Sequence, residues 1–113
     1  MFESSFLQAV NEAKSRIKEC KMSAVKEMLA NDKMDGILID VREQYEYQQN
    51  HIPGAINISR GVLEANIKAE VSNKKQKIYL YCSGGVRSAL SADSLQNLGY
   101  KDVISISDGF AAW

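Results

Sequence analysis

The pattern of apolar and polar positions predicts short buried strands that alternate with helices. From residue 3 to residue 19, apolar side chains recur three or four positions apart, which predicts an amphipathic helix. Its apolar positions are Phe6, Leu7, Val10, Ala13 and Ile17. Three later runs, Ile37 to Val41, Ile78 to Tyr81 and Val103 to Ile106, are short and rich in β-branched residues. Runs of this kind are typical of strands buried on both faces.

Helical patterns separate the three predicted strands. A second helix is expected from residue 24 to about residue 31, with Ser23 as its N-cap. Further helices are expected over residues 43 to 49, 61 to 71 and 88 to 98, and Gly99 is placed to end the last one. This alternation predicts one α/β domain with a mainly parallel sheet, whose ligands bind beyond the carboxyl ends of the strands.

Composition narrows the classes of function. With 113 residues, 45% of them hydrophobic, the chain has the profile of a single globular domain. Lysine plus arginine and aspartate plus glutamate number 14 each, so no charge excess points to nucleic acid or an anionic membrane. No apolar run approaches the roughly 20 residues that span a bilayer, and the first residues do not resemble a secretory signal, so we expect a cytoplasmic protein.

The segment from Tyr81 to Ser88 carries the most chemical information. A predicted strand runs into Cys82, then through the adjacent glycines Gly84 and Gly85 into a predicted helix. Glycines allow positive φ, so the loop amides can turn inward at the helix N-terminus and favour an anion. Together with Arg87, they would hold Cys82 as a thiolate nucleophile. The alternative is that Cys82 is only a small buried apolar residue.

The second cysteine, Cys20, lies in a different sequence context. Cys20 lies in a charged stretch without a glycine loop and is expected to have no catalytic role. The two cysteines sit in such different contexts that free thiols are expected rather than a disulfide.

Three motifs resemble those of the rhodanese domain family. Residues 39 to 47 with residues 50 to 58 resemble its amino-terminal signature, residues 82 to 88 resemble its active-site loop, and residues 108 to 113 resemble its closing motif. The resemblance spans about residues 21 to 113. It implies a five-stranded parallel sheet flanked by helices and a sulfurtransferase that needs no metal and no organic cofactor.

Site residues follow from the resemblance by position. Cys82 matches the residue that forms a persulfide, and the substrate-binding loop comprises Ser83, Gly84, Gly85, Val86, Arg87 and Ser88. Asp40 and Arg42 match the family's Asp-x-Arg element. Two roles are open for this pair: it supports the loop, or it is a salt bridge that only fixes the end of a strand. His51, the single histidine, matches a residue in a structural turn. The implied donor is a small sulfur-containing anion such as thiosulfate, and the implied acceptor is cyanide or a thiol, protein thiols included.

The sequence departs from the family pattern in three places. Asn50 stands where the family usually has glycine, which predicts a positive φ at Asn50. Family members usually continue beyond the position of Trp113, so a truncated domain is one reading of residues 21 to 113. Residues 1 to 20 would form an appended amphipathic helix that packs on the domain or pairs with another chain; the oligomeric state stays open.

Two other functions compete with sulfur transfer. A rhodanese fold can serve as a non-catalytic binding or regulatory module, although such a module has no need of a reactive thiol. A cysteine phosphatase or arsenate reductase also places cysteine and arginine around an anion loop. Phosphatases need five residues between them, whereas Cys82 and Arg87 are separated by four.

Overall fold

The chain folds around one five-stranded sheet. The computed structural model describes residues 2–113. All strand pairs are parallel, and the order across the sheet is β1-β5-β4-β2-β3, which confirms the predicted fold class. The strands are β1 (Lys18–Cys20), β2 (Ile37–Asp40), β3 (Ile56–Asn57), β4 (Ile78–Tyr81) and β5 (Val103–Ile106).

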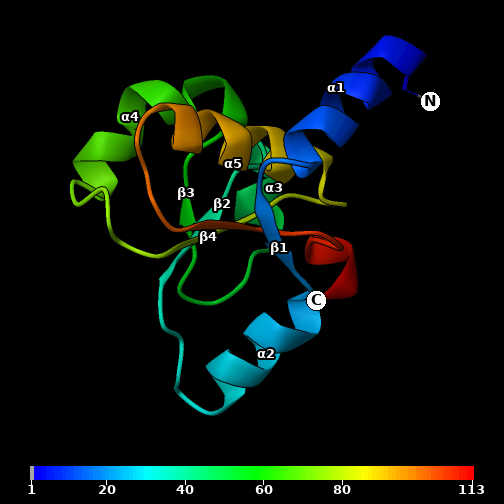
Figure 1. The fold of residues 1–113 in the computed structure, drawn as a ribbon. Coiled ribbons are helices and arrows are strands. Elements are labelled where there is room, and N and C mark those ends of the chain that lie inside the picture. Colours follow the sequence, from blue (N-terminus) through cyan, green and yellow to red (C-terminus); the bar gives the residue numbers. More distant parts are fainter. Residues whose placement is uncertain (1) are drawn as a thin grey trace.

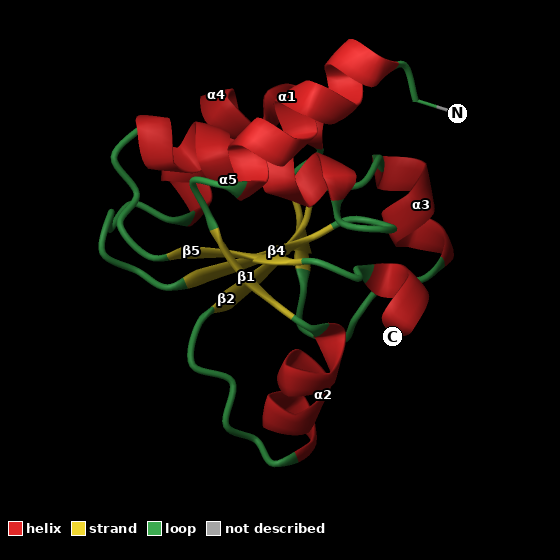
Figure 2. Cartoon of the chain, turned by 45° about the vertical axis from the view of Figure 1, so that its right-hand side comes forward, coloured by secondary structure: helices red, strands yellow, loops and turns green. Residues whose placement is uncertain are grey.

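Helices cover both faces of this sheet. The α-helices are α1 (Ser4–Lys14), α2 (Met22–Ala30), α3 (Gln44–Gln49), α4 (Leu63–Glu70) and α5 (Val86–Asn97), and the 3₁₀ turns are η1 (Arg60–Val62) and η2 (Phe110–Ala112). In Figures 1 and 2, α1, α4 and α5 lie above the sheet and α2 lies below it. No helix within residues 2–113 is both long enough and apolar enough to cross a bilayer.

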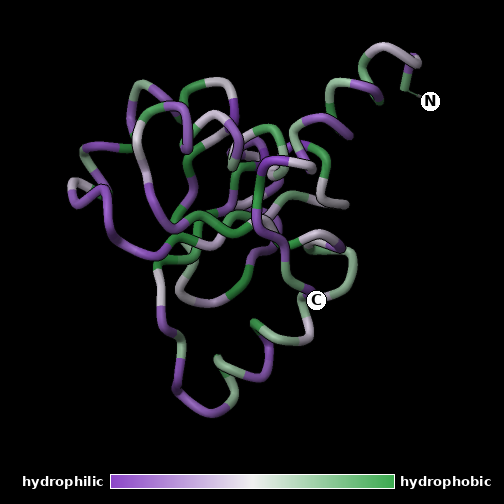
Figure 3. The backbone as a smooth tube through the Cα atoms, viewed as in Figure 1, coloured by the Kyte–Doolittle hydropathy of each residue, from purple (hydrophilic) through white to green (hydrophobic). Residues whose placement is uncertain are grey.

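Strand alternation divides the apolar side chains into two cores. In β4, Ile78 and Leu80 join the core beneath α4 and α5, as does Cys82 just beyond the strand, whereas Tyr79 and Tyr81 join the core against α2. Hydrophobic positions concentrate along the central strands in Figure 3. Because both of their faces are buried, β2, β4 and β5 are largely apolar runs, which is why the sequence revealed these three strands.

The first helix is shorter than the sequence pattern predicts. It was expected to extend to residue 19, but it ends at Lys14, where the backbone N–H of Ser15 bonds to the carbonyls of Asn11 and Glu12. Residues 18 to 20 instead pair with β5 as an edge strand. The prediction of a helix over residues 15 to 19 was wrong, because the backbone of residues 18 to 20 hydrogen-bonds to β5. The spacing of apolar residues along the chain does not reveal such a partner.

Two local predictions also need correction. Ser23 is not the N-cap of α2; the helix starts at Met22, whose N–H donates to Oδ1 of Asp108 at 2.7 Å, 86 positions away in sequence. Asn50 does not adopt positive φ: it is extended, with φ −168°, and its carbonyl oxygen accepts a hydrogen bond from Arg42. In that turn the positive φ, 89°, belongs to Gly54.

The cap of α2 gives a prediction about stability. Replacing Asp108 with alanine leaves the Met22 N–H without its carboxylate partner, so the free energy of unfolding should fall by about 1 to 2 kcal/mol. Urea denaturation measures the loss. Asp102→Ala, which removes only a surface ion pair with Lys18, is the control and should cost about 0.5 kcal/mol or less. Equal losses in the two variants would contradict the capping role.

Candidate functional site

Cys82 lies at the carboxyl end of the central strand β4. Its side chain is 1% exposed and faces α5, because residues 78, 80 and 82 share one face of the sheet. The chain then passes through Ser83, Gly84 and Gly85 into α5. The predicted loop therefore lies where parallel α/β sheets bind their ligands.

Backbone amides at the start of α5 point at the sulfur. The N–H of Gly85 lies 3.1 Å from Sγ, and the N–H of Ser88 lies 3.4 Å from it. Both belong to the unpaired amides of a helix N-terminus, which carries partial positive charge. Negative charge on this sulfur, or on an atom bonded to it, would be stabilised by these donors.

A pair of buried serines lies behind the sulfur. The Ser88 hydroxyl is 3.6 Å from Sγ, and the Ser105 hydroxyl donates to Ser88 Oγ at 2.9 Å. Both serines are fully buried. Ser88 was among the predicted loop residues, but Ser105 on β5 was missed. Its signal was a polar residue at an inward position of the apolar run Val103 to Ile106.

Two glycines allow the loop to pack against the segment after β5. Gly85 has φ 96°, and a Cβ there would lie 2.1 Å from the carbonyl oxygen of Ser107. Gly109 has φ 62°, and a Cβ there would lie 2.6 Å from the carbonyl oxygen of Cys82. That carbonyl accepts the Phe110 N–H at 2.8 Å. The closing motif thus holds the backbone of Cys82 from behind.

Arg87, expected to contact the substrate anion, is paired with a carboxylate. Its guanidinium meets Glu46 of α3 at 2.8 Å and 3.3 Å and donates to Ser83 Oγ at 3.0 Å. The hydrogen bond with Arg87 lowers the pKa of Glu46, and the same bond raises the pKa of Arg87. Sequence reasoning missed Glu46, because its only local signal was the capping box that it forms with Glu43.

Asp40 and Arg42 form a buried ion pair on the α2 face of the sheet. Arg42 Nη2 lies 2.8 Å from Asp40 Oδ2, and the guanidinium carbon lies 4.4 Å from the centre of the Phe110 ring. Burial works to lower the pKa of Arg42, but the hydrogen bonds and charge of Asp40 outweigh it and raise that pKa. Among the hydrogen bonds within residues 2–113, none joins this pair to Cys82. The geometry is that of a pair that fixes the strand end, and the Arg42 guanidinium lies over the rings of Phe110 and Tyr81, which flank the loop region.

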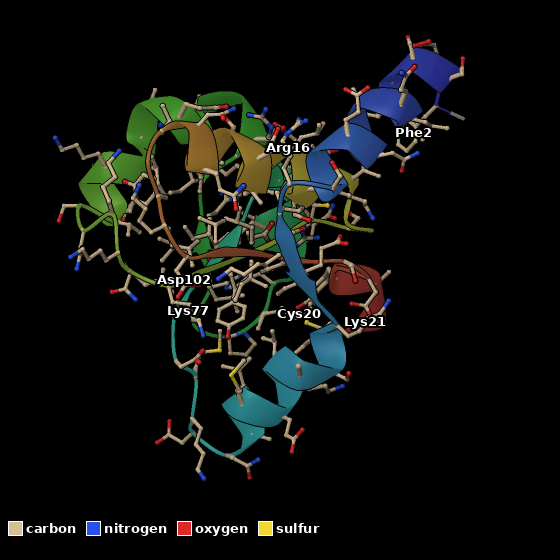
Figure 4. All side chains as sticks on the ribbon, in the orientation of Figure 1. Phe2, Arg16, Cys20, Lys21, Lys77 and Asp102 are labelled. Carbon is tan, nitrogen blue, oxygen red and sulfur yellow. The ribbon has the colours of Figure 1, made fainter. Side chains whose placement is uncertain are left out.

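Two other residues lie apart from the loop. His51, in the segment after α3, hydrogen-bonds the carbonyl of Tyr47 through Nδ1 at 2.8 Å and stacks on the Tyr47 ring. Cys20 is a free, half-buried thiol where β1 meets α2, and burial raises its pKa (Figure 4). Within residues 2–113, no group of three or more histidine, cysteine, aspartate or glutamate side chains is placed to hold a metal.

A cavity of about 510 Å³ opens above Cys82. Its wall comes from the loop, the start of α5, α1 and the segment just before α1. The lining residues are Phe2, Phe6, Cys82, Ser83, Gly84, Val86 and Arg87. Figure 4 shows Phe2 at the free end of α1. The two phenylalanines were not predicted as site residues, although Phe6 was part of the apolar stripe of the first helix.

Substitution by alanine should affect stability differently at Gly84 and at Gly85. Gly85→Ala forces positive φ on alanine and a clash with Ser107, so it should destabilise the chain by about 2 kcal/mol or more and displace the amides from Cys82. Gly84→Ala is the matched control, since its φ is not positive and a Cβ there meets nothing within 4 Å. Thermal denaturation of both variants compares them; similar melting temperatures would refute this account.

The ion pair between Glu46 and Arg87 predicts a pH dependence of stability. Because the folded-state pKa of Glu46 lies below its ordinary 4.5, the pair's contribution is complete above that value and is lost as pH falls through the folded pKa. Glu46→Gln should cost about 1 kcal/mol or less near pH 7, and the difference from wild type should shrink towards about pH 3. Urea denaturation across this range tests it, with the exposed Glu27→Gln as control. A difference that stays constant with pH would contradict the pairing.

Comparison with known proteins places the chain among relatives of shared fold. The rhodanese-like domain model matches residues 21–113. The putative sulfur carrier protein YrkF of Bacillus subtilis is 36% identical over 103 residues, which cover 91% of this chain and 54% of that protein. The chain thus spans about half the length of that relative. The thiosulfate sulfurtransferase GlpE of Pseudoalteromonas translucida is 37% identical over 84 residues, which cover 73% of this chain and 76% of that one.

Solved structures agree with the sequence matches. A protein of unknown function from Rhodopseudomonas palustris, described as a possible tyrosine phosphatase, superposes with a TM-score of 0.87 at 31% identity. The superposition covers 96% of this chain and 87% of that one. Fold, motif order and sequence identity therefore agree, and the chain belongs to the rhodanese-like domain family.

Proposed function

We propose that this chain is a sulfurtransferase that carries sulfane sulfur as a persulfide on Cys82. The observation that carries the proposal is the position of Sγ, which accepts from the N–H groups of Gly85 and Ser88 at 3.1 Å and 3.4 Å below an open cavity. Family membership and the name of a thiosulfate sulfurtransferase relative support it.

In the first half-reaction, the Cys82 thiolate attacks the outer sulfur of a sulfane donor such as thiosulfate. A bond forms between Sγ and that sulfur, and the original S–S bond breaks. Sulfite leaves with the bonding electron pair, and Cys82 keeps the transferred sulfur as a persulfide anion. No oxidant, metal or organic cofactor enters the balance.

In the second half-reaction, a thiolate or cyanide attacks the terminal sulfur of the persulfide. The new product is a persulfide or thiocyanate, and Cys82 leaves as the thiolate. Negative charge therefore lies on or next to Sγ throughout the cycle. A pre-positioned N–H donor at such a charge typically contributes about 3 kcal/mol to transition-state stabilisation.

The other predicted residues have supporting parts in this proposal. Ser83, Gly84 and Val86 shape the mouth of the cavity, and Gly85 gives the loop its positive φ. Arg87 braces the loop through Glu46 and Ser83. Asp40 and Arg42 hold the neighbouring strand end. The reaction needs a reduced thiol, which suits a reducing compartment such as the cytoplasm.

A phosphatase is the second candidate, because the Rhodopseudomonas palustris neighbour is described as a possible tyrosine phosphatase. Two observations weigh against it in this chain. Only four residues separate Cys82 from Arg87, and the guanidinium that would bind a phosphate is paired with Glu46. A binding module without catalysis is disfavoured by the amides directed at Sγ.

Mass spectrometry of the intact protein tests the assignment. After incubation with thiosulfate, the wild type should gain one sulfur atom that a reductant removes, and Cys82→Ser should gain none. Cys20→Ser is the matched control and should load as the wild type does, because Cys20 lacks the amide donors. Loading of Cys82→Ser, or absence of a reducible adduct on the wild type with thiosulfate and with organic thiosulfonates alike, would refute a persulfide on Cys82. Hydrolysis of an aryl phosphate would instead favour the second candidate.

A further inference from the structure

Phe2, which precedes α1, and Phe6, near the start of α1, form one wall of the cavity above Cys82. Phe2 and Phe6 line it from one side, and Val86 and Arg87 line it from the other. The two phenyl rings lie 5.1 Å apart, centre to centre, in a tilted arrangement. Phe2 is 54% exposed and Phe6 is half-buried, so their ring surfaces are open to an incoming molecule.

The position of this wall is fixed at the other end of the helix. Val10 and Ala13 are buried, and α1 packs along α5. Arg16, just after the helix, makes two hydrogen bonds to Asp93 on α5, at 2.9 Å and 2.8 Å. Glu3 caps the first turn by accepting from the N–H groups of Ser5 and Phe6. The phenylalanines therefore project over the loop from an anchored helix.

The charges around the cavity disfavour a small, highly charged substrate. Arg87 is the cation in its lining, and both of its terminal nitrogens are already bound to Glu46. A dianion such as thiosulfate would have to compete with Glu46 and would lose water against two phenyl rings that offer no hydrogen bonds. A single charge at the reacting sulfur, by contrast, would meet the amides of Gly85 and Ser88.

We propose that Phe2 and Phe6 determine specificity, so that the site prefers sulfur substrates carrying an aryl or branched alkyl group beside the reacting sulfur. This inference rests on the proposed sulfur transfer at Cys82. The apolar group packs on the phenyl wall, where burial of carbon and contact between sulfur and aromatic rings are favourable. The reactive end then lies between the loop amides.

The reaction with such a donor balances as it does with thiosulfate. For an organic thiosulfonate anion, the Cys82 thiolate attacks the terminal sulfur, and the bond between the terminal and sulfonyl sulfurs breaks. The sulfinate anion leaves with the electron pair, and the persulfide anion stays on Cys82. Cyanide then removes the terminal sulfur as thiocyanate, which regenerates the thiolate.

Two donors with the same charge and the same reacting group test the wall. Benzenethiosulfonate and methanethiosulfonate differ in the apolar group, and kcat/KM for thiocyanate formation is measured with each. The ratio of the two values, benzene over methane, should fall by roughly tenfold or more from wild type to Phe2→Ala/Phe6→Ala, since apolar contacts of this size discriminate at that level. Comparing variants cancels the intrinsic difference in reactivity between the donors.

Leu7→Ala is the matched control. Leu7 is a large apolar residue on the same helix and is 41% exposed, but it does not line this cavity. Its ratio should equal that of the wild type. Circular dichroism checks that α1 remains folded in every variant, and Val10, Ala13 and Arg16 keep its anchor.

The possible outcomes distinguish the role of Phe2 and Phe6 from sulfur transfer at Cys82 itself. An unchanged ratio in Phe2→Ala/Phe6→Ala, with both donors still forming thiocyanate through Cys82, overturns the role of the wall and leaves sulfur transfer standing. Failure of thiosulfate and both thiosulfonates to load Cys82 in the wild type overturns sulfur transfer, and the inference with it.

Discussion

The close backbone packing between the loop after β4 and the segment after β5 determines the geometry of the site. Gly85 approaches the carbonyl of Ser107, and Gly109 approaches the carbonyl of Cys82, at distances that leave no room for a Cβ. The Phe110 N–H then binds the Cys82 carbonyl. With its backbone held from behind, the cysteine can present its sulfur only towards α5, where the N–H groups of Gly85 and Ser88 are free to receive it.

The sulfur of Cys82 is surrounded mainly by uncharged groups within residues 2–113. Cys82 is almost fully buried, and its Sγ accepts from the N–H groups of Gly85 and Ser88. The thiol in turn faces Ser88 Oγ, which also accepts from the Ser105 hydroxyl. Arg87 faces the same cavity, but Glu46 neutralises it. The N–H dipoles of Gly85 and Ser88 act on this sulfur at short range and favour negative charge at that one atom.

The amino-terminal helix α1 borders the cavity above Cys82 through Phe6. Its carboxyl-terminal half is fixed to α5 by Val10, Ala13 and the pair of Arg16 with Asp93. Its amino-terminal half extends beyond α5 (Figure 1), and Phe6 on that half lines the cavity above Cys82. The residues that anchor α1 and those that face Cys82 are thus different. Substitutions at Phe2 and Phe6 can alter the cavity without detaching the helix.

By itself, the sequence determined the fold class, the three central strands and the loop that carries Cys82, because buried parallel strands are continuous apolar runs and a pair of glycines before a helix is a local signal. It could not determine where α1 ends or what caps α2, since the edge strand β1 forms only against β5 and the cap comes from Asp108. The pairing of Arg87 with Glu46, the contact of Ser105 with Ser88, and the phenyl wall above Cys82 were likewise decided only by the tertiary structure. Each joins residues far apart in sequence, and the physical reason is that packing of the sheet and helices, not local pattern, sets which side chains meet.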